Sequence, residues 1–505
     1  MPELTVSEQP QVVRVPAARP RPAVSWQWLA LAGITLLGAI LRFATISSQS
    51  YWLDEAATVH LAHLPLGQLL HQVRVSETTP PLYFIVAWLW AKLFGTGEVG
   101  LRSLSALLGI GAIPLTYACG RELISRWAGL LAALFAAVSP FLIWYSQEAR
   151  SYMLFAVLSG LSFLFFLRAR RTGANRDIVW WAVFSSLAMS THFFAGFLVA
   201  PEGILLLLRR RSRAVLLANS AVAAVQVAWL PLALSDTKHP LSWIKAFPLG
   251  VRIKQVPVDL GLSSLFQSSL VTGGLIAAAV LAVIVGLLIV YGRAPRPGNA
   301  AVAAIVAACV ILLPVLLAPL GPDYVVPRNF IPAWIPLAVL LAAACTAPRT
   351  LPVGAALAAL ALGAFVWAGI RIDQEPQYQR PDWRGVAAAV GRPAGTRAIV
   401  AYDSGFASRP LAVYLPGVSW DSPSPSPVSL DEVDVVGSPW QTTPPRLPAG
   451  VSLTSSRVVG TFLVERFRLT SPWRLSPQEV AARAGLLLGP PSATPAVLIQ
   501  RGPES

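Results

Sequence analysis

Charged residues and cysteines are scarce in this sequence. Asp, Glu, Lys and Arg account for only 12% of its 505 residues, whereas hydrophobic residues account for 55%. Soluble domains carry about 25% charged residues, so this scarcity excludes an ordinary soluble protein and indicates an integral membrane protein. Only three cysteines occur, Cys119, Cys309 and Cys345, and all lie within or beside apolar runs, which argues against a disulfide framework or a zinc site.

Acidic residues are also few, 24 against 39 basic ones, and the formal charge is +15. Most arginines stand in short clusters between apolar segments, as in residues 168–176 and 209–213. This distribution is the positive-inside pattern of membrane proteins, which carries information about orientation. It is not the basic stripe of a nucleic-acid-binding protein, so the expected partner is a membrane and not a nucleic acid.

The apolar runs between these clusters predict an all-α polytopic protein with about eleven transmembrane helices. The first run follows a basic tail without a small-residue cleavage site, so it is expected to be a retained span. Placing every arginine cluster in the cytoplasm puts the C-terminus outside, because the number of spans is odd. The expected spans are residues 27–46, 99–118, 127–143, 149–167, 178–191, 193–208, 214–234, 264–291, 299–318, 331–346 and 351–370.

One apolar run cannot be a further span if every arginine cluster lies in the cytoplasm. The segment "PPLYFIVAWLWAKLFG" has roughly 14 residues between its prolines and its glycine, fewer than the ~20 that a helix needs to cross the hydrocarbon core. We predict an outer juxtamembrane helix over residues 81–94 that does not span. Its aromatic side chains are expected at headgroup depth, where such rings are favoured: Tyr83, Phe84, Trp88 and Trp90.

The composition changes after the last predicted span. Residues 371–505 are rich in Pro, Ser and Arg, and "DWRGVAAAVGRPAGTRAIVAYDSG" predicts an amphipathic helix, a turn and a short strand. We therefore expect three parts: a cytoplasmic basic tail (1–26), a transmembrane catalytic domain (27–370) and a small extracytoplasmic α/β domain (371–505). The segment "SWDSPSPSPVSL" is typical of an ordinary loop.

Ionisable residues gather in the predicted outer loops, where they are costly and invite a functional interpretation. Simpler interpretations stay open. Asp54 and Glu55 in "YWLDEA" could cap a helix. Glu148 could form a structural ion pair with Arg150 or with a loop arginine, and the charge of Arg328 could extend from the mouth of a span. His192 fits a hydrogen-bonded residue at a span end. Three further acids are expected to be mostly solvated loop charges: Glu77, Glu98 and Asp236.

An ordered set of motifs carries a family resemblance. It comprises "YWLDEA", "TPPLYFIVAWLWAKLFGTGEVGLRSLSALLGI", "GRELISRWAGLLAALFAAVSPFLIWYSQEARSYM", "THFFAGFLV", "RNFIPAWIPLAVLLA" and "DWRGVAAAV". Together these motifs, over residues 27 to about 415, resemble bacterial members of the GT-C superfamily. The similarity is to family 39, the protein mannosyltransferase and aminoarabinose transferase group.

The resemblance implies transfer of mannose or another monosaccharide from a polyprenyl-phosphate donor to a hydroxyl of a lipid, glycan or protein acceptor. Transfer would occur at the outer face of the cell membrane and invert the anomeric centre. Asp54 would be the general base, with Glu55 and Glu148 orienting the acceptor or the base. Arg328 would hold the donor phosphate.

The remaining site residues follow from the same resemblance. Further donor-phosphate contacts are expected from Arg150 and Lys245. A pocket for acceptor or donor is expected from five side chains: Tyr51, Trp52, Tyr145, His192 and Tyr324. No cofactor is implied with certainty, because some GT-C relatives use a divalent cation and others do not; if one is used, its ligands would be Asp54, Glu55 and Glu148.

Two other functions are compatible with many spans and buried charges. A lipid or sugar transporter usually has paired halves with broken helices in matching positions, which are not apparent here. A non-catalytic scaffold that binds a polyprenyl lipid would keep the spans without needing the acidic pair.

Overall fold

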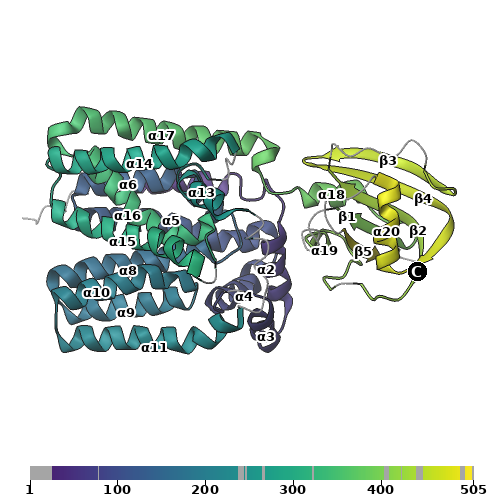
Figure 1. Cartoon of the computed structure of the whole chain (residues 1–505), viewed down its shortest axis with the longest axis horizontal. Coiled ribbons are helices and arrows are strands. Elements are labelled where there is room, and N and C mark those ends of the chain that lie inside the picture. The colour runs from purple at the N-terminus through teal and green to yellow at the C-terminus, as the bar shows by residue number, and fades with distance from the viewer. Residues whose placement is uncertain are drawn as a thin grey trace, which may run out of the picture.

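The computed structural model describes residues 26–77, 79–236, 244, 247–263, 268–320, 323–402, 409–421, 423–438, 447–488 and 495–502. A long bundle of helices comes first, and a small sheet region lies against one end of it (Figure 1). The bundle helices are α1 (Trp26–Phe43), α5 (Glu98–Leu123), α6 (Arg126–Val138), α7 (Pro140–Ser146), α8 (Tyr152–Thr172), α9 (Asn175–Met189), α10 (Gly196–Arg209), α11 (Arg213–Asp236), α14 (Ser268–Tyr291), α15 (Pro297–Leu317), α16 (Trp334–Cys345) and α17 (Leu351–Gln374).

These helices make the chain a multi-pass membrane protein, as expected. By length and composition, seven helices among the described residues could cross a membrane, and the α6–α7 pair, bent by 57°, would be an eighth. The bend lies at Pro140, where the Ser139 hydroxyl caps α7 by accepting from the Leu142 amide (3.3 Å). Ten of the eleven predicted spans overlap a single α-helix, and the span predicted at 127–143 overlaps the bent α6–α7 pair; α9 and α10 have only 15 and 14 residues. The count of eleven crossings stays a prediction.

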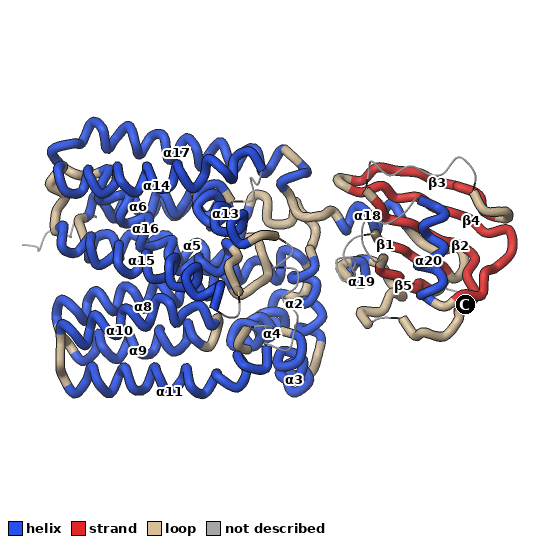
Figure 2. Tube along the Cα trace, viewed as in Figure 1, coloured by secondary structure: helices blue, strands red, loops and turns tan. Residues whose placement is uncertain are grey.

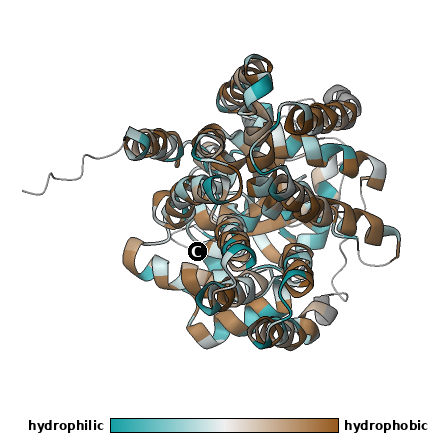
Figure 3. Ribbon diagram, turned by 90° about the vertical axis from the view of Figure 1, so that its left-hand side faces the viewer, coloured by the Kyte–Doolittle hydropathy of each residue, from teal (hydrophilic) through white to brown (hydrophobic). Residues whose placement is uncertain are grey.

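The bundle exposes apolar side chains on its outer surface. Viewed from the end opposite the sheet region, many helices are brown on their outward faces (Figure 3). Examples are Ile276 of α14, Leu316 of α15 and Leu360 of α17, which are 66%, 66% and 72% exposed. A surface of this kind is stable against lipid and would be a liability in water.

Short helices fill the end of the bundle that faces the sheet region: α2 (Leu53–His63), α3 (Leu66–Ser76), α4 (Leu82–Phe94) and α13 (Leu249–Leu262) (Figure 1). The predicted helix at 81–94 is present as α4, but its expected outer face is wrong. Tyr83 and Phe84 are 1% and 2% exposed and pack against Leu69 and Leu104. The exposed apolar residues are instead Leu89, Leu93 and Phe94. The hydrophobic run is apolar all round, so its periodicity could not select the buried face.

The C-terminal region is a five-stranded sheet, shown in red in Figure 2. Its strands lie in the order β3-β4-β2-β1-β5, and only β1 and β2 are parallel. Helix α20 packs on one face and α18 on the other. The bounds are α18 (Trp383–Val390), β1 (Arg397–Ala401), α19 (Leu411–Tyr414), β2 (Val428–Gly437), β3 (Val451–Val459), β4 (Phe462–Leu475), α20 (Pro477–Leu488) and β5 (Ala496–Gln500). The expected small α/β fold is confirmed, with the predicted helix and strand present as α18 and β1.

The sheet region is joined to the bundle by polar contacts. Arg384 of α18 pairs with Glu98 (2.5 Å), and the Tyr414 hydroxyl donates to the other oxygen of Glu98 (2.5 Å). The Ser50 hydroxyl donates to the carbonyl of Pro381 (2.9 Å). Glu98 is therefore a contact between the two parts and not the solvated loop charge that was expected.

Candidate active site

A cavity of about 240 Å³ lies at the junction between the bundle and the sheet region. Four separate parts of the chain form its wall: the residue before α2, the α7 end with the following loop, the segment around Arg328, and the segment before α18. Its lining residues are Trp52, Trp144, Tyr145, Glu148, Arg328, Gln377, Tyr378, Gln379, Arg380 and Pro381. Aromatic rings and arginines therefore face one another across a space of the size of a small ligand.

Asp54 and Arg328 form an ion pair beside this cavity. Asp54 stands in the first turn of α2, and Arg328 in a 3₁₀ helix, η3 (Pro327–Ala333), that Pro327 begins. The Arg328 Nη1 atom lies 3.3 Å from Asp54 Oδ2, and about a fifth of each side chain stays exposed (21% and 22%). The guanidinium also lies over the rings of Trp52 and Tyr152, at 5.8 and 5.6 Å from their centroids. A fixed cation thus sits next to an accessible carboxylate.

Glu55 occupies a different environment from its neighbour Asp54. It is fully buried and accepts two hydrogen bonds from Arg102, from Nε and Nη2, both 2.7 Å long. Arg102 also donates to three carbonyls of the preceding loop, those of Ile46 (3.0 Å), Gln49 (2.6 Å) and Ser50 (3.0 Å), so all five of its N–H groups are used. Burial acts to raise the pKa of Glu55, but the Arg102 guanidinium outweighs it and holds that pKa below its ordinary value. This pair fixes the loop that leads to Asp54.

Of the two partners left open for Glu148, the structure shows a loop arginine, Arg380 (3.1 Å), and not Arg150. The Arg150 amide donates to the Glu148 carbonyl (2.8 Å) in a tight turn, and the Arg150 side chain reaches Glu77 instead (2.8 Å). Glu77 is therefore not a solvated loop charge, because its partner is buried. Arg380 lies 3.9 Å from Glu55 as well, so it links two of the predicted catalytic carboxylates.

Comparison with solved structures identifies the fold. The structure of ArnT from Cupriavidus metallidurans superposes with a TM-score of 0.51 at 13% sequence identity, covering 88% of this chain and 98% of that one. The chain therefore has an ArnT-like GT-C fold. The fold predicted from the motifs is thereby confirmed.

Other matches cover less of this chain. Residues 78–235 match the family described as dolichyl-phosphate-mannose-protein mannosyltransferase, a stretch that contains Glu148 but neither Asp54 nor Arg328. An uncharacterized protein of Aquifex aeolicus (strain VF5) is 32% identical over 162 residues, and the match spans 31% of each chain. The oligosaccharyltransferase AglB of Archaeoglobus fulgidus has 14% identity and a TM-score of 0.44, covering 72% of this chain and 57% of that one.

The cavity is lined by only some of the pocket residues predicted from the sequence. Trp52 and Tyr145 line it. Tyr51 does not, because its hydroxyl donates to the Thr96 carbonyl (3.1 Å) behind the cavity wall. His192 does not either: its Nδ1 accepts from the Phe194 amide (3.2 Å) and its ring stacks on Phe155, which is the hydrogen-bonded role weighed for it.

Two further site residues were predicted, Tyr324 and Lys245. Tyr324 lies outside the cavity lining, and its carbonyl accepts from the Asn329 side chain (2.9 Å). Lys245 lies outside the described residues.

The metal ligands considered from the sequence do not form one cluster in this site. Among the described residues, no group of three or more His, Cys, Asp or Glu side chains could hold a metal ion. Each of the three predicted carboxylates faces an arginine: Asp54 faces Arg328, Glu55 faces Arg102 and Glu148 faces Arg380. Arg380 also lies 3.9 Å from Glu55, so arginines occupy the space between these carboxylates, and the conditional metal set of Asp54, Glu55 and Glu148 stays a prediction.

Sequence reasoning missed Arg380 and its neighbours from residue 377 on. They belong to the region that the sequence assigned to the C-terminal domain, residues 371–505. The predicted boundary at residue 371 falls inside α17, because that helix ends at Gln374. The Arg380 guanidinium lies 4.2 Å from the centroid of Trp144 and is 3% exposed. The polar run "QYQRPDW" directly before the recognised "DWRGVAAAV" motif was the available signal.

Burial raises the pKa of the Glu148 carboxyl to about 7 against the pull of Arg380, and the nearby carboxylates of Glu55 and Asp54 act in the same direction as burial. The pKa of Glu148 in the folded state exceeds its ordinary value of 4.5. Protonated Glu148 therefore contributes stability to the fold below that value, and this contribution is lost as pH rises through about 7.

We expect the melting temperature to fall more steeply from about pH 5 to about pH 8 in the wild type than in Glu148→Gln. Parallel melting curves for the two proteins would contradict this.

Proposed function

We propose that the protein is a membrane glycosyltransferase that moves a monosaccharide, mannose or another hexose or pentose, from a polyprenyl-phosphate donor to an acceptor hydroxyl. The observation that carries the proposal is the Asp54–Arg328 pair, which is partly exposed beside a cavity lined by aromatic rings. A carboxylate and a fixed cation at one place are what this transfer needs: a base for the hydroxyl and a partner for the leaving phosphate.

The relatives support this choice of donor. The matching family is described by its use of dolichyl-phosphate mannose, and the ArnT structure is described as bound to undecaprenyl phosphate. Both molecules are polyprenyl phosphates. The acceptor is a lipid, a glycan or a protein.

In the proposed reaction, the donor phosphate binds Arg328 and thereby releases Asp54 from its ion pair. The Asp54 carboxylate then takes the proton of the acceptor hydroxyl as its oxygen attacks the anomeric carbon. The bond from that carbon to the phosphate oxygen breaks, and polyprenyl phosphate leaves as an anion held by Arg328. A single displacement inverts the anomeric centre.

The other predicted residues have supporting roles in this proposal. Glu55 positions Asp54 through Arg102, as its full burial suggests. Glu148 and Arg380 border the cavity and orient the acceptor or the sugar. Arg150 holds the backbone carbonyl of Asp54 (3.3 Å) and is engaged by Glu77, so a direct phosphate contact by Arg150 has less support than one by Arg328.

Replacing Arg328 with lysine should weaken donor binding by about tenfold or more. Lysine keeps the charge but loses the paired N–H donors that match a phosphate. The measurement is retention of a polyprenyl-phosphate sugar by purified protein, followed by native mass spectrometry, with Arg74→Lys on the exposed surface of α3 as the control. Equal retention by both variants would remove Arg328 from donor binding.

We further propose that the cavity and residues 371–505 face the outside of the cell, that 27–370 form the catalytic domain, and that 1–26 form a cytoplasmic tail. Support comes from the arginine clusters of residues 168–171 and 209–211, which lie at the ends of α8 and α10. Cysteines introduced at the exposed positions His71, Thr172 and Ser424 test the arrangement. An impermeant thiol reagent should label positions 71 and 424 in intact cells but not position 172; labelling of all three from outside would contradict it.

A further inference from the structure

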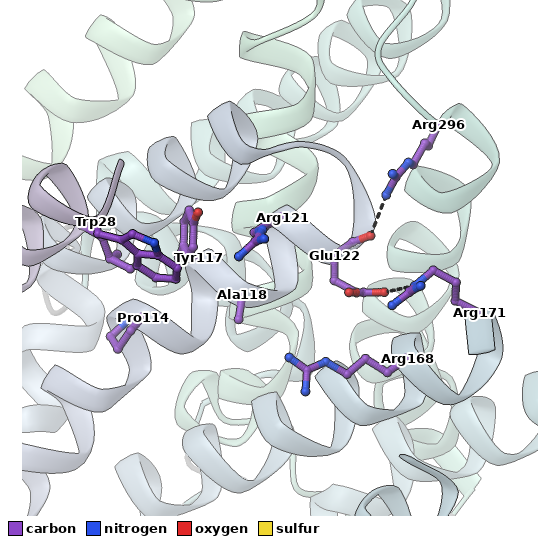
Figure 4. A pocket seen from close by; sticks show the side chains of 10 residues that line it. Trp28, Pro114, Tyr117, Ala118, Arg121, Glu122, Arg168, Arg171 and Arg296 are labelled. Carbon is purple, nitrogen blue, oxygen red and sulfur yellow. Dashed lines mark hydrogen bonds and ion pairs between the residues drawn. The ribbon is translucent and has the colours of Figure 1, made fainter. Parts of the chain in front are cut away.

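A second cavity, of about 540 Å³, lies at the other end of the bundle. It is formed where the beginning of α1 meets the ends of α5 and α8 and the residue before α15 (Figure 4). Its volume falls within the roughly 300–1,000 Å³ of typical ligand sites. The lining residues are Trp28, Leu31, Pro114, Tyr117, Ala118, Arg121, Glu122, Arg168, Arg171 and Arg296.

The charges in this cavity are unbalanced. Its lining contains four arginines and a single carboxylate, that of Glu122. Glu122 is already engaged: its side chain accepts from Arg171, and its backbone carbonyl accepts from Arg296 (3.0 Å). These contacts are the dashed lines of Figure 4.

The other two arginines stand apart from that network. Within the described part of the chain, Arg121 and Arg168 have no carboxylate partner; each instead contacts a ring, Arg121 that of Trp28 (6.0 Å) and Arg168 that of Phe165 (5.3 Å). Two guanidinium groups that line one cavity, without a carboxylate partner among the described residues, favour a ligand that supplies an anion, and arginine suits phosphate through its paired donors.

The rest of the wall is apolar or aromatic. Leu31 and Pro114 continue the cavity along α1 and α5, and Trp28 is 47% exposed at its edge. Tyr117 is 2% exposed, and its hydroxyl has no hydrogen-bond partner among the described residues. A basic end joined to an apolar wall is complementary to a lipid with a negatively charged headgroup.

We propose that this cavity binds an anionic phospholipid, with its phosphate between Arg121 and Arg168 and an acyl chain along Leu31 and Pro114. The site is separate from the proposed catalytic cavity and does not depend on the proposed reaction. The bound lipid neutralises the excess positive charge and joins α1, α5 and α8 at this end of the bundle.

The test compares the full-length protein, purified in neutral detergent, with the double variant Arg121→Gln/Arg168→Gln. A matched control, Arg176→Gln/Arg211→Gln, removes two exposed arginines that do not line the cavity. Phosphatidylglycerol should raise the melting temperature of wild type and control, and phosphatidylcholine with the same acyl chains should not. The double variant should need about tenfold more phosphatidylglycerol for the same shift. Native mass spectrometry should show the same loss as fewer retained lipids.

Each other outcome would overturn the proposal. Equal stabilisation of the double variant and the control would show that these two arginines do not form a site. Equal stabilisation by the two lipids would show that the headgroup charge is not recognised. If inorganic phosphate alone reproduced the full shift, the occupant would be a soluble phosphate and the assignment to a lipid would fail.

Discussion

Asp54→Asn is expected to lower the turnover of the proposed transfer by ~10²–10⁴-fold while the protein stays folded. Asparagine keeps the shape of the side chain and its place in the first turn of α2, but it cannot accept the proton of the acceptor hydroxyl. The partial exposure of Asp54 beside the cavity is what makes proton transfer there feasible. The rate of product formation at saturating donor is the measurement.

A purely structural role for Asp54 gives a different result. If it only capped α2, asparagine, itself a good cap, would be nearly silent. The cap position of α2 is Trp52, and no side chain makes a capping hydrogen bond there. Asp177→Asn provides the matched control, because Asp177 also lies in the first turn of a helix, α9, at a partly exposed position that does not line the cavity. The Asp177→Asn control should keep full activity. Full activity in Asp54→Asn would contradict the proposal that Asp54 is the base and would leave Glu55 or Glu148 as the candidate.

Arg102→Met is expected to destabilise the fold by about 3–5 kcal/mol, because it leaves Glu55 as a buried charge without its main partner. It also removes the donors to three loop carbonyls. The melting temperature in detergent measures the effect, and Arg74→Met on the exposed surface of α3 serves as the control.

The double variant Arg102→Met/Glu55→Gln separates the two causes. If the unpaired charge dominates, neutralising Glu55 should recover part of the lost stability. A double variant less stable than Arg102→Met would contradict the charge argument and would assign the cost to the loop carbonyls.

The sequence predicted the membrane fold well because hydrophobic runs and arginine clusters are local signals. The expected spans overlap helices for that reason. The motif "YWLDEA" likewise led to Asp54, and "RNFIPAW" led to Arg328, which the fold brings together across 274 residues of sequence.

The ion-pair partners were not predictable in the same way. Glu77 pairs with Arg150, 73 residues away, and Glu98 with Arg384, 286 residues away. No periodicity links such residues, because the choice of partner depends on how distant segments pack. Arg380 was missed for the same reason: it belongs to a loop whose position against Trp144 is set by the docking of the sheet region.

The central claim is that this protein consumes a polyprenyl-phosphate sugar. The most direct test is to reconstitute the purified wild type in liposomes with a panel of radiolabelled polyprenyl-phosphate sugars and to measure the polyprenyl phosphate released. We expect release, by transfer or slow hydrolysis, from at least one donor, and its loss in Asp54→Asn protein of equal melting temperature. Movement of the intact donor across the membrane without release, as for a transporter, or binding without either, as for a scaffold, would contradict the claim.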